Sequence, residues 1–415
     1  MKLQKLLFLF ISIQSILIPQ TLDISKLDLK YYQKFKGQNM ILNVYNWGEY
    51  ISDGSDDSIN INKEFEELTG IKVNYSTFAS NEELYVKLKL GGIAYDIIIQ
   101  SDYMIAKLIK ENLIQKLNYK NIPAYTNIKP RFYKEIYDPN GEYSVAYTWG
   151  VNGIIYNKKL VDEEKIDWDI LFNKKYAGKI LMYYNPRDAF GVAQAYLNYS
   201  LNTTKESELR ECARILKEQK PLVQAYVMDE IYDKMESEEA AIGVYYAGDS
   251  LTMIDNNDNL NFVIPPKGAN LFVDALCIPE NAQNIEAAEL YINFLCEGEV
   301  ALANIEYINY ASPNNAALKI MSEETKNNKI IYPPNEILDN CEVYITLPEE
   351  TNLLMEELWN EILSNDIAYS GWVVPLSLAI VVALCIVIIM LRNKKKYLAI
   401  CVNICYNFTL LGHFA

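Results

Sequence analysis

Residues 41–111 alternate strand-like apolar runs with helical segments, and this alternation restricts the possible folds more than any other feature of the chain. The strand-like runs cover residues 41–46, 71–76 and 95–100. Strands that alternate with helices form βαβ units, in which the strands run parallel. The run Ile97-Ile98-Ile99 is continuously apolar, as expected for a strand buried on both faces. The sequence therefore predicts an α/β fold with helices on both faces of a parallel sheet.

Short signals mark where these helices begin and end. Ser80 followed by Glu83 is a capping-box pattern, which predicts a helix start. Ser101 is placed to cap the helix after the third strand. Gly70 and Gly91 predict helix ends, because glycine adopts the left-handed conformation without steric cost.

The later part of the chain predicts a second α/β unit. Strands are predicted at 143–156, 179–183, 242–246 and 260–264, and helices at 188–201, 205–218, 284–296, 298–306 and 349–363. Trp149-Gly150 is interpreted as a crossing between two lobes. A length of 415 residues is large for one domain and fits two lobes with additional segments.

The composition favours a cation as the ligand and excludes nucleic acid. The chain has 54 Asp and Glu residues against 38 Lys and Arg residues. Such an acidic field repels nucleic acid and attracts cations. Its 32 tyrosines combine an aromatic ring with a polar tip, which suits a partly hydrated cleft.

The N-terminal segment, residues 1–20, has the pattern of a signal peptide or an uncleaved anchor. Lys2 and Lys5 precede a mostly apolar run that is short for a membrane span. The small-residue pattern of a cleavage site does not follow this run, so both interpretations stay open. Residues 21–39 are polar and irregular, and they predict a linker.

Residues 371–391 predict a transmembrane helix, because they are mostly apolar and free of charged side chains. The basic cluster Lys394-Lys395-Lys396 follows at once, and positively charged flanks stay on the cytoplasmic side. This orientation places the folded part on the extracellular or periplasmic side of the cell membrane and residues 392–415 in the cytoplasm.

The sequence gives little support for an enzyme and none for a cofactor. It contains no phosphate-binding glycine loop, no dinucleotide fingerprint and no nucleophile elbow. The single histidine, His413, lies beyond the predicted membrane helix, which excludes a Ser-His-Asp or Cys-His site in the folded part. A hydrolase that uses two carboxylates stays a minor alternative, although no pair is recognisable by spacing.

The end of the first predicted strand is the clearest candidate for a binding site. Trp47, Glu49 and Tyr50 offer two flat ring faces and one negative charge just beyond a strand. Ligands in open α/β sheets bind at this position, and rings with a carboxylate suit a cation that has an apolar body. The alternative is that the rings plug the edge of the core and Glu49 lies in solvent.

From residue 40 to residue 363 the chain resembles the spermidine/putrescine-binding proteins of polyamine ABC importers. The resemblance rests on several motifs in the same order: Tyr45-Asn46-Trp47-Gly48-Glu49-Tyr50, Gly70-Ile71-Lys72-Val73, Tyr95-Asp96-Ile97-Ile98, Gln100-Ser101-Asp102-Tyr103, Tyr147-Thr148-Trp149-Gly150, Asp274-Ala275-Leu276-Cys277-Ile278-Pro279 and Tyr310-Ala311-Ser312-Pro313-Asn314. Any one motif alone is weak, and their common order makes the resemblance specific.

The resemblance implies a two-lobe periplasmic binding protein fold with crossing hinge strands, and a ligand in the cleft between the lobes. The expected first lobe is 40–150 with 274–336, and the second is 151–273 with 337–365. The implied ligand contacts are Trp47, Glu49, Tyr50, Ser101, Tyr103, Asn185, Asp188, Tyr246, Phe272, Asp274, Tyr310 and Tyr344. Asp274 corresponds to the carboxylate regarded in the family as the main amine partner.

The chain departs from the family pattern at several of these positions. Asn185 stands where a second acid is common, and Tyr246 and Phe272 replace two tryptophans. Tyr344 takes a late glutamine position. Rings are kept at both tryptophan positions, but the missing carboxylate puts a preference for triamine over diamine in doubt.

These features predict a solute-binding component that captures putrescine or spermidine and delivers it to ABC permease subunits. A polyamine is a methylene chain with ammonium groups, which the rings and carboxylates can bind together. Another organic cation or a ferric ion is the alternative, because the adjacent Tyr245-Tyr246 also occurs in ferric-ion-binding relatives of this fold.

Overall fold

The computed structural model divides the chain into two compact units, residues 1–359 and 360–415. It describes residues 22–92 and 94–364, which form most of the first unit and only the start of the second. The predicted signal or anchor, the membrane helix 371–391 and the tail 392–415 therefore lie outside the described residues. Within the described part, no helix is both long and apolar enough to cross a membrane.

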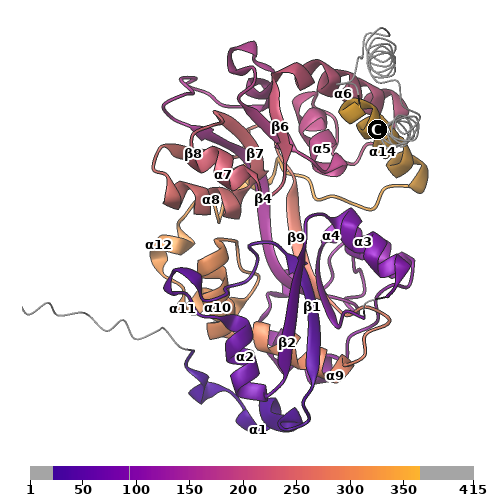
Figure 1. Ribbon diagram of the computed structural model, residues 1–415, viewed down its shortest axis with the longest axis vertical. Helices are drawn as coiled ribbons and strands as arrows, with labels where there is room; N and C mark the ends of the chain where they lie inside the picture. Colours follow the sequence, from indigo (N-terminus) through magenta and orange to yellow (C-terminus); the bar gives the residue numbers. More distant parts are fainter. Residues whose placement is uncertain (1–21, 93, 365–415) are drawn as a thin grey trace, which may run out of the picture. The chain divides into compact units, whose positions relative to one another are not determined.

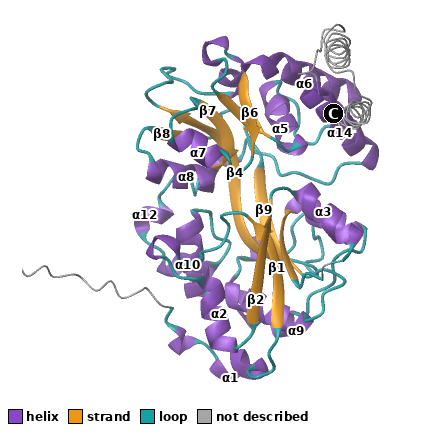
Figure 2. Ribbon diagram, in the orientation of Figure 1, coloured by secondary structure: helices purple, strands orange, loops and turns teal. Residues whose placement is uncertain are grey.

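The described part of the first unit contains nine strands. They are β1 Ile41–Trp47, β2 Lys72–Phe78, β3 Ile97–Ser101, β4 Val145–Asn157, β5 Ile180–Tyr183, β6 Val223–Val227, β7 Ile242–Tyr246, β8 Leu260–Val263 and β9 Leu271–Cys277. Their order is β2-β1-β3-β9-β4-β7-β5-β6, and β8 pairs with β4. Helices pack around these strands (Figure 2).

Parallel pairs lie at both ends of this strand order, and antiparallel strands join them. β1 pairs in parallel with β2 and β3, and β5 pairs in parallel with β6 and β7. β4 and β9 run antiparallel to each other through the middle of Figure 1. We call β1–β3 with their helices the first half, and β5–β8 with theirs the second half.

The strand β4 changes partner along its length, and this change joins the two halves. It pairs with β9 from Val145 to Val151 and with β7 from Asn152 to Tyr156. The change follows directly after Trp149-Gly150, the position interpreted from the sequence as a crossing. The α/β architecture predicted from the sequence is thus confirmed.

The described helices are mostly at the predicted positions. They are α1 Leu29–Tyr32, α2 Ile61–Thr69, α3 Asn81–Leu90, α4 Asp102–Lys110, α5 Pro186–Tyr196, α6 Glu206–Gln219, α7 Ile231–Glu236, α8 Ala247–Asn256, α9 Ile285–Leu295, α10 Gly298–Ile308, α11 Asn315–Ile320, α12 Glu323–Lys326, α13 Asn335–Leu338 and α14 Glu349–Ser364. The prediction missed the helices α1, α7, α8, α11, α12 and α13 and the strands β6 and β9. β6 pairs only with β5 and is partly exposed, so it lacks the continuous apolar run of an inner strand.

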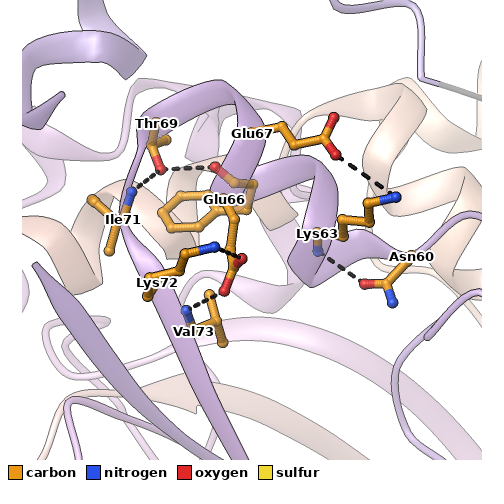
Figure 3. Close-up of polar contacts among 9 residues, drawn as sticks. Asn60, Lys63, Glu66, Glu67, Thr69, Ile71, Lys72 and Val73 are labelled. Atoms are coloured by element: carbon orange, nitrogen blue, oxygen red, sulfur yellow. Dashed lines mark hydrogen bonds and ion pairs between the residues drawn. The ribbon is translucent and has the colours of Figure 1, made fainter. Parts of the chain in front are cut away.

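Polar contacts fix the helix α2 against the strand β2 (Figure 3). The Asn60 side chain accepts a hydrogen bond from the backbone N–H of Lys63 at 2.8 Å and caps the helix start. At the other end, Gly70 has a φ of 77°, as predicted for a helix stop. Glu66 then accepts hydrogen bonds from Lys72 Nζ (2.7 Å) and from the Val73 N–H (2.8 Å).

Residues 22–36 differ from the linker predicted at 21–39, because they form short helices that pack on the first half. Tyr32 in α1 is 1% exposed, and its ring lies 6.0 Å from that of Phe294. Its hydroxyl donates a hydrogen bond to Glu297 at 2.8 Å. Leu27, Tyr31 and Phe35 also pack against the core of the first half. Burial of one large ring contributes on the order of 1.5–3 kcal/mol, so several apolar side chains hold a segment that looks polar in the sequence.

Candidate functional site

One cavity collects residues from both halves and from the strands that join them. It has about 650 Å³ of empty space, including its open part. All predicted site residues except Glu49 and Asn185 line it: Trp47, Tyr50, Ser101, Tyr103, Asp188, Tyr246, Phe272, Asp274, Tyr310 and Tyr344. The ends of β1, β3 and β7 thus meet at this cavity, as expected for ligand sites in α/β proteins.

Asp274 on β9 is a buried carboxylate, and one of its two oxygens has no hydrogen-bond partner among the described residues. Its register partners are Ser101 on β3 and Thr148 on β4, so strands hold it on both sides. Oδ2 accepts a hydrogen bond from Tyr50 Oη at 2.7 Å, and Oδ1 has no partner among the described residues. Burial raises its pKa to about 6, although the hydrogen bond from Tyr50 and the nearby Ser101 hydroxyl oppose the shift.

Ser101 therefore acts differently from its prediction. It occupies the position before α4, but its side chain makes no capping hydrogen bond there. It instead lies opposite Asp274 in the strand register, and its hydroxyl helps to lower the pKa of that carboxyl. The prediction was correct for the position, because the helix begins directly after Ser101, but wrong for the side chain, which does not cap it.

Asp188 is the second buried carboxylate, and Asn185 supports it from behind. Oδ1 of Asn185 accepts from the Asp188 N–H at 2.8 Å, which caps α5. Its Nδ2 donates to Asp188 Oδ2 at 2.7 Å, and Tyr246 Oη donates to the same oxygen at 2.7 Å. Burial raises the pKa of Asp188 despite these bonds. Asn185 thus orients a lining residue rather than lining the cavity itself.

Three further carboxylates, Asp102, Asp229 and Asp249, line the cavity and were not among the predicted contacts. Asp249, in the first turn of α8, accepts hydrogen bonds from Tyr232 (2.7 Å) and from Tyr310. Burial raises its pKa to about 7. Asp229 accepts from Tyr245 Oη at 3.1 Å, and its charge helps to raise the pKa of Asp249. The signal for Asp249 was an acid four residues after Tyr245, just past a predicted strand.

A row of rings lies between Asp274 and Asp249. The ring of Tyr50, which donates to Asp274, lies 5.0 Å from that of Tyr310, which donates to Asp249. The Phe272 ring lies 6.1 Å from Tyr310 and 5.5 Å from Tyr246. The cavity therefore has carboxylates at two places with aromatic surface between them.

Two glycines leave the space that this row of rings needs. A Cβ at Gly150 would lie 2.8 Å from the Phe272 ring, and one at Gly248 would lie 2.5 Å from the Tyr310 ring. Contacts below 3.0 Å force a shift. Any larger residue at either position would therefore force the Phe272 or the Tyr310 ring to move.

The remaining predicted residues form the wall on the side of α3 and α4. The Trp47 ring packs against Phe78 at 4.5 Å between centroids. Tyr103 donates to Glu82 at 3.2 Å. Tyr344 packs beneath the guanidinium of Arg187, whose Cζ lies 4.2 Å from the ring centroid. This arginine is buried, and burial lowers its pKa.

Glu49 does not reach the cavity lining. It is exposed, and its φ of 50° turns the chain sharply after β1. Partial burial of the carboxylate raises its pKa, and the nearby Asp229 adds to that rise. The prediction that this side chain contacts the ligand depends on a movement that the structure does not display.

The tyrosine pair considered for ferric iron serves two different carboxylates. Tyr245 donates to Asp229 and Tyr246 donates to Asp188. In residues 22–92 and 94–364 no group of three or more His, Cys, Asp or Glu residues could hold a metal ion. The geometry therefore gives the iron alternative no support beyond the sequence pair itself.

Comparisons with known proteins agree on one family. Residues 93–340, more than half of the chain, match the family described as bacterial extracellular solute-binding protein. The spermidine/putrescine-binding periplasmic protein of Escherichia coli is 35% identical over 306 residues, which covers 73% of this chain and 86% of the relative. The putrescine-binding periplasmic protein SpuD of Pseudomonas aeruginosa is 29% identical over 346 residues, 79% of this chain and 93% of the relative.

A solved structure gives the same result. The spermidine/putrescine ABC transporter substrate-binding protein PotD of Streptococcus pneumoniae is 37% identical, with a TM-score of 0.67, and the match covers 78% of this chain and 98% of that one. That protein and the Escherichia coli relative are both named for the binding of spermidine and putrescine or of a transport substrate. This chain therefore belongs to the bacterial extracellular solute-binding proteins, within the group of spermidine/putrescine-binding proteins of polyamine ABC transporters.

Proposed function

We propose that this protein captures a polyamine, putrescine or spermidine, in the cavity and delivers it to the permease of an ABC importer. The observation that carries the proposal is the placement of Asp274 and Asp249 on either side of a row of rings. Carboxylates at two places suit two ammonium groups, and the rings between them suit the methylene chain. The proposal includes no catalytic step and no cofactor.

The contacts available are sufficient for tight binding. Each charge-assisted hydrogen bond contributes about 1.5–3 kcal/mol, and each ring facing a cation adds roughly 0.5–2 kcal/mol. Micromolar affinity needs about 8 kcal/mol net. Asp188, Asp249 and Asp274 with the lining rings exceed this sum before the cost of ordering a flexible ligand is subtracted.

The proposal also includes the two lobes that were predicted from the sequence. The first lobe is 40–150 with 274–336, and the second is 151–273 with 337–365. The lining residues named above bind the ligand, and Asn185 acts through Asp188. The partner change of β4 near Trp149-Gly150 supports a hinge there, and closure would bring contacts from both lobes onto one ligand.

Membrane attachment completes the proposal. Residues 371–391 hold the protein at the outer face of the cell membrane, with Lys394-Lys395-Lys396 inside, and the permease is a separate protein. Protease added to cells with an accessible outer membrane face should release the folded part. Resistance of that part, while a known outward-facing control is cleaved, would contradict the orientation.

Calorimetry tests the binding itself. The full chain in detergent is titrated with putrescine, spermidine and, as a control, sodium chloride of equal ionic strength. We expect saturable heat from at least one amine at micromolar concentration. An absence of binding by both amines up to about 1 mM, which corresponds to about 4 kcal/mol, would reject the proposal. An iron titration with a visible charge-transfer band would instead support the ferric alternative.

A further inference from the structure

The cavity wall at the ends of β1 and β2 carries two buried polar atoms without partners. Trp47 ends β1 and pairs in register with Phe78, which ends β2. Asn81 begins α3 three residues later. Both Trp47 and Asn81 line the cavity. Their side-chain atoms Nε1 and Oδ1 are buried and have no hydrogen-bond partner in the described part of the chain.

The neighbours of Asn81 define its free atom as an acceptor. Its side chain is 93% buried, and its Nδ2 lies 2.9 Å from Tyr103 Oη. That hydroxyl has one proton, which it donates to Glu82 Oε1 at 3.2 Å. The atom of Asn81 that faces Tyr103 must therefore be the donor Nδ2. The remaining atom, Oδ1, is therefore an acceptor to which a ligand N–H group could donate.

A fully protonated polyamine satisfies only one of these two atoms. Its nitrogen atoms are donors without a free lone pair, so they can bind Asn81 Oδ1 but cannot accept from the Trp47 indole. An indole N–H is a donor only, and a buried donor without an acceptor is unfavourable. A secondary amide has one C=O acceptor and one N–H donor, which complement Trp47 Nε1 and Asn81 Oδ1.

We propose that the cavity also binds polyamines acylated on one nitrogen, with the amide at Trp47 and Asn81. The inference rests on the proposed function, because the remaining ammonium needs the cavity carboxylates. Asp274 has the free oxygen for that ammonium. Phe78 and Ala79 also line this wall, and they offer apolar surface to the acyl group.

Three ligands separate amide recognition from general amine binding. The full chain in detergent is titrated with putrescine, N-acetylputrescine and heptylamine, which matches the acetylated ligand in length but has no amide. We expect N-acetylputrescine to bind more tightly than heptylamine by about fivefold or more, because two hydrogen bonds of ordinary strength are gained. Equal or weaker binding than heptylamine would overturn the inference.

Two variants locate the amide. Trp47→Phe keeps a ring but removes the donor, and Asn81→Ala removes the acceptor. Each should abolish most of the advantage of N-acetylputrescine over heptylamine, a ratio that a general loss of packing does not change. Trp168→Phe is the control, since it also removes a buried indole N–H, which donates to the Gly268 carbonyl at 2.8 Å, and Trp168 lies away from the cavity lining. It should leave the ratio unchanged.

The outcomes also separate this inference from the proposed function. If putrescine binds and N-acetylputrescine does not, the proposed function stands and the inference fails. If neither ligand binds, the proposed function fails first. A ratio that stays the same in both Trp47→Phe and Asn81→Ala overturns the placement of the amide at this wall.

Discussion

Asp274 and Asp249 are both buried in the same cavity and both accept hydrogen bonds from tyrosines, yet only one of them has an oxygen left for a ligand. Asp274 uses Oδ2 for Tyr50 and leaves Oδ1 without a partner in the described part of the chain. Asp249 uses one oxygen for Tyr232 and the other for Tyr310. An ammonium can therefore join Asp274 directly, whereas at Asp249 it must share or replace a tyrosine.

The two carboxylates also differ in how firmly they are held. Asp274 lies in the middle of β9, with β3 and β4 on either side. Asp249 lies at the start of α8, and its tyrosines come from α7 and from the segment after α10. A strand between two others fixes a side chain closely, and a helix start depends on its neighbours. The difference predicts unequal contributions to binding.

The largest effect is expected for Asp274→Asn. Removal of the charge leaves a buried ammonium without its main counter-ion, which typically costs about 3–5 kcal/mol. Calorimetry with putrescine should therefore show an affinity loss of about 100-fold or more. The comparison fails if this loss is no larger than that of Asp249→Asn measured in the same buffer.

Asp249→Asn should have a smaller effect of about tenfold, which corresponds to about 1.4 kcal/mol. The asparagine keeps an acceptor for one tyrosine, and the ammonium already has to compete for this carboxylate. Asp255→Asn is the matched control, because Asp255 lies on the same helix but is exposed. If Asp249→Asn leaves the affinity as it is in the control, the second ammonium binds elsewhere.

Putrescine affinity should rise with pH between about 5 and 8. In the ligand-free protein, burial raises the pKa of Asp274 to about 6 and that of Asp249 to about 7. A bound ammonium favours the ionised forms, so binding lowers both pKa values and releases protons. Below pH 5 both carboxyls are protonated and this contribution is lost; above pH 8 it is complete.

Calorimetry in two buffers of different ionisation enthalpy measures the released protons directly. The number of released protons should be largest between pH 6 and 7. Asp249→Asn should reduce this number near pH 7, at the upper end of the range. Release that is absent over this whole range would mean that the carboxyls are already ionised before the ligand arrives. Such a result would contradict the raised pKa values of Asp274 and Asp249.

The sequence was sufficient for the parts of this site that follow strand ends or family motifs. Trp47 and Tyr50 belong to a motif at the end of a predicted strand, and Asp274 belongs to a family motif; the structure places all three at the cavity. Asp249 was missed because α8 begins with Ala247-Gly248 and has no capping side chain, so no helix start was visible. Its role depends on Tyr232 and Tyr310, which are distant in sequence and meet only in the fold.

Asn185 and Glu49 show a different kind of error. Both were predicted from the sequence as ligand contacts, but the structure places neither side chain in the cavity lining. Asn185 is the cap of α5 and points its amide at Asp188. Pairing of a cap with the residue three positions on is a local geometry that the sequence can suggest. Whether the same side chain also lines a cavity depends on the packing of β7 and α5, which no local pattern contains.

Glu49→Gln should have the smallest effect, a loss of about threefold or less for putrescine. The carboxylate is exposed and lies outside the cavity lining, so it acts on the ligand only through water. Exposed charges of this kind contribute about 0–1 kcal/mol, and salt screens them over roughly 10 Å at 0.1 M. Titrations at about 0.05 and 0.5 M sodium chloride should show that the small loss disappears at high salt. A tenfold loss that persists at high salt would mean that Glu49 contacts the ligand, and a third carboxylate would then have to join the comparison of Asp274 with Asp249.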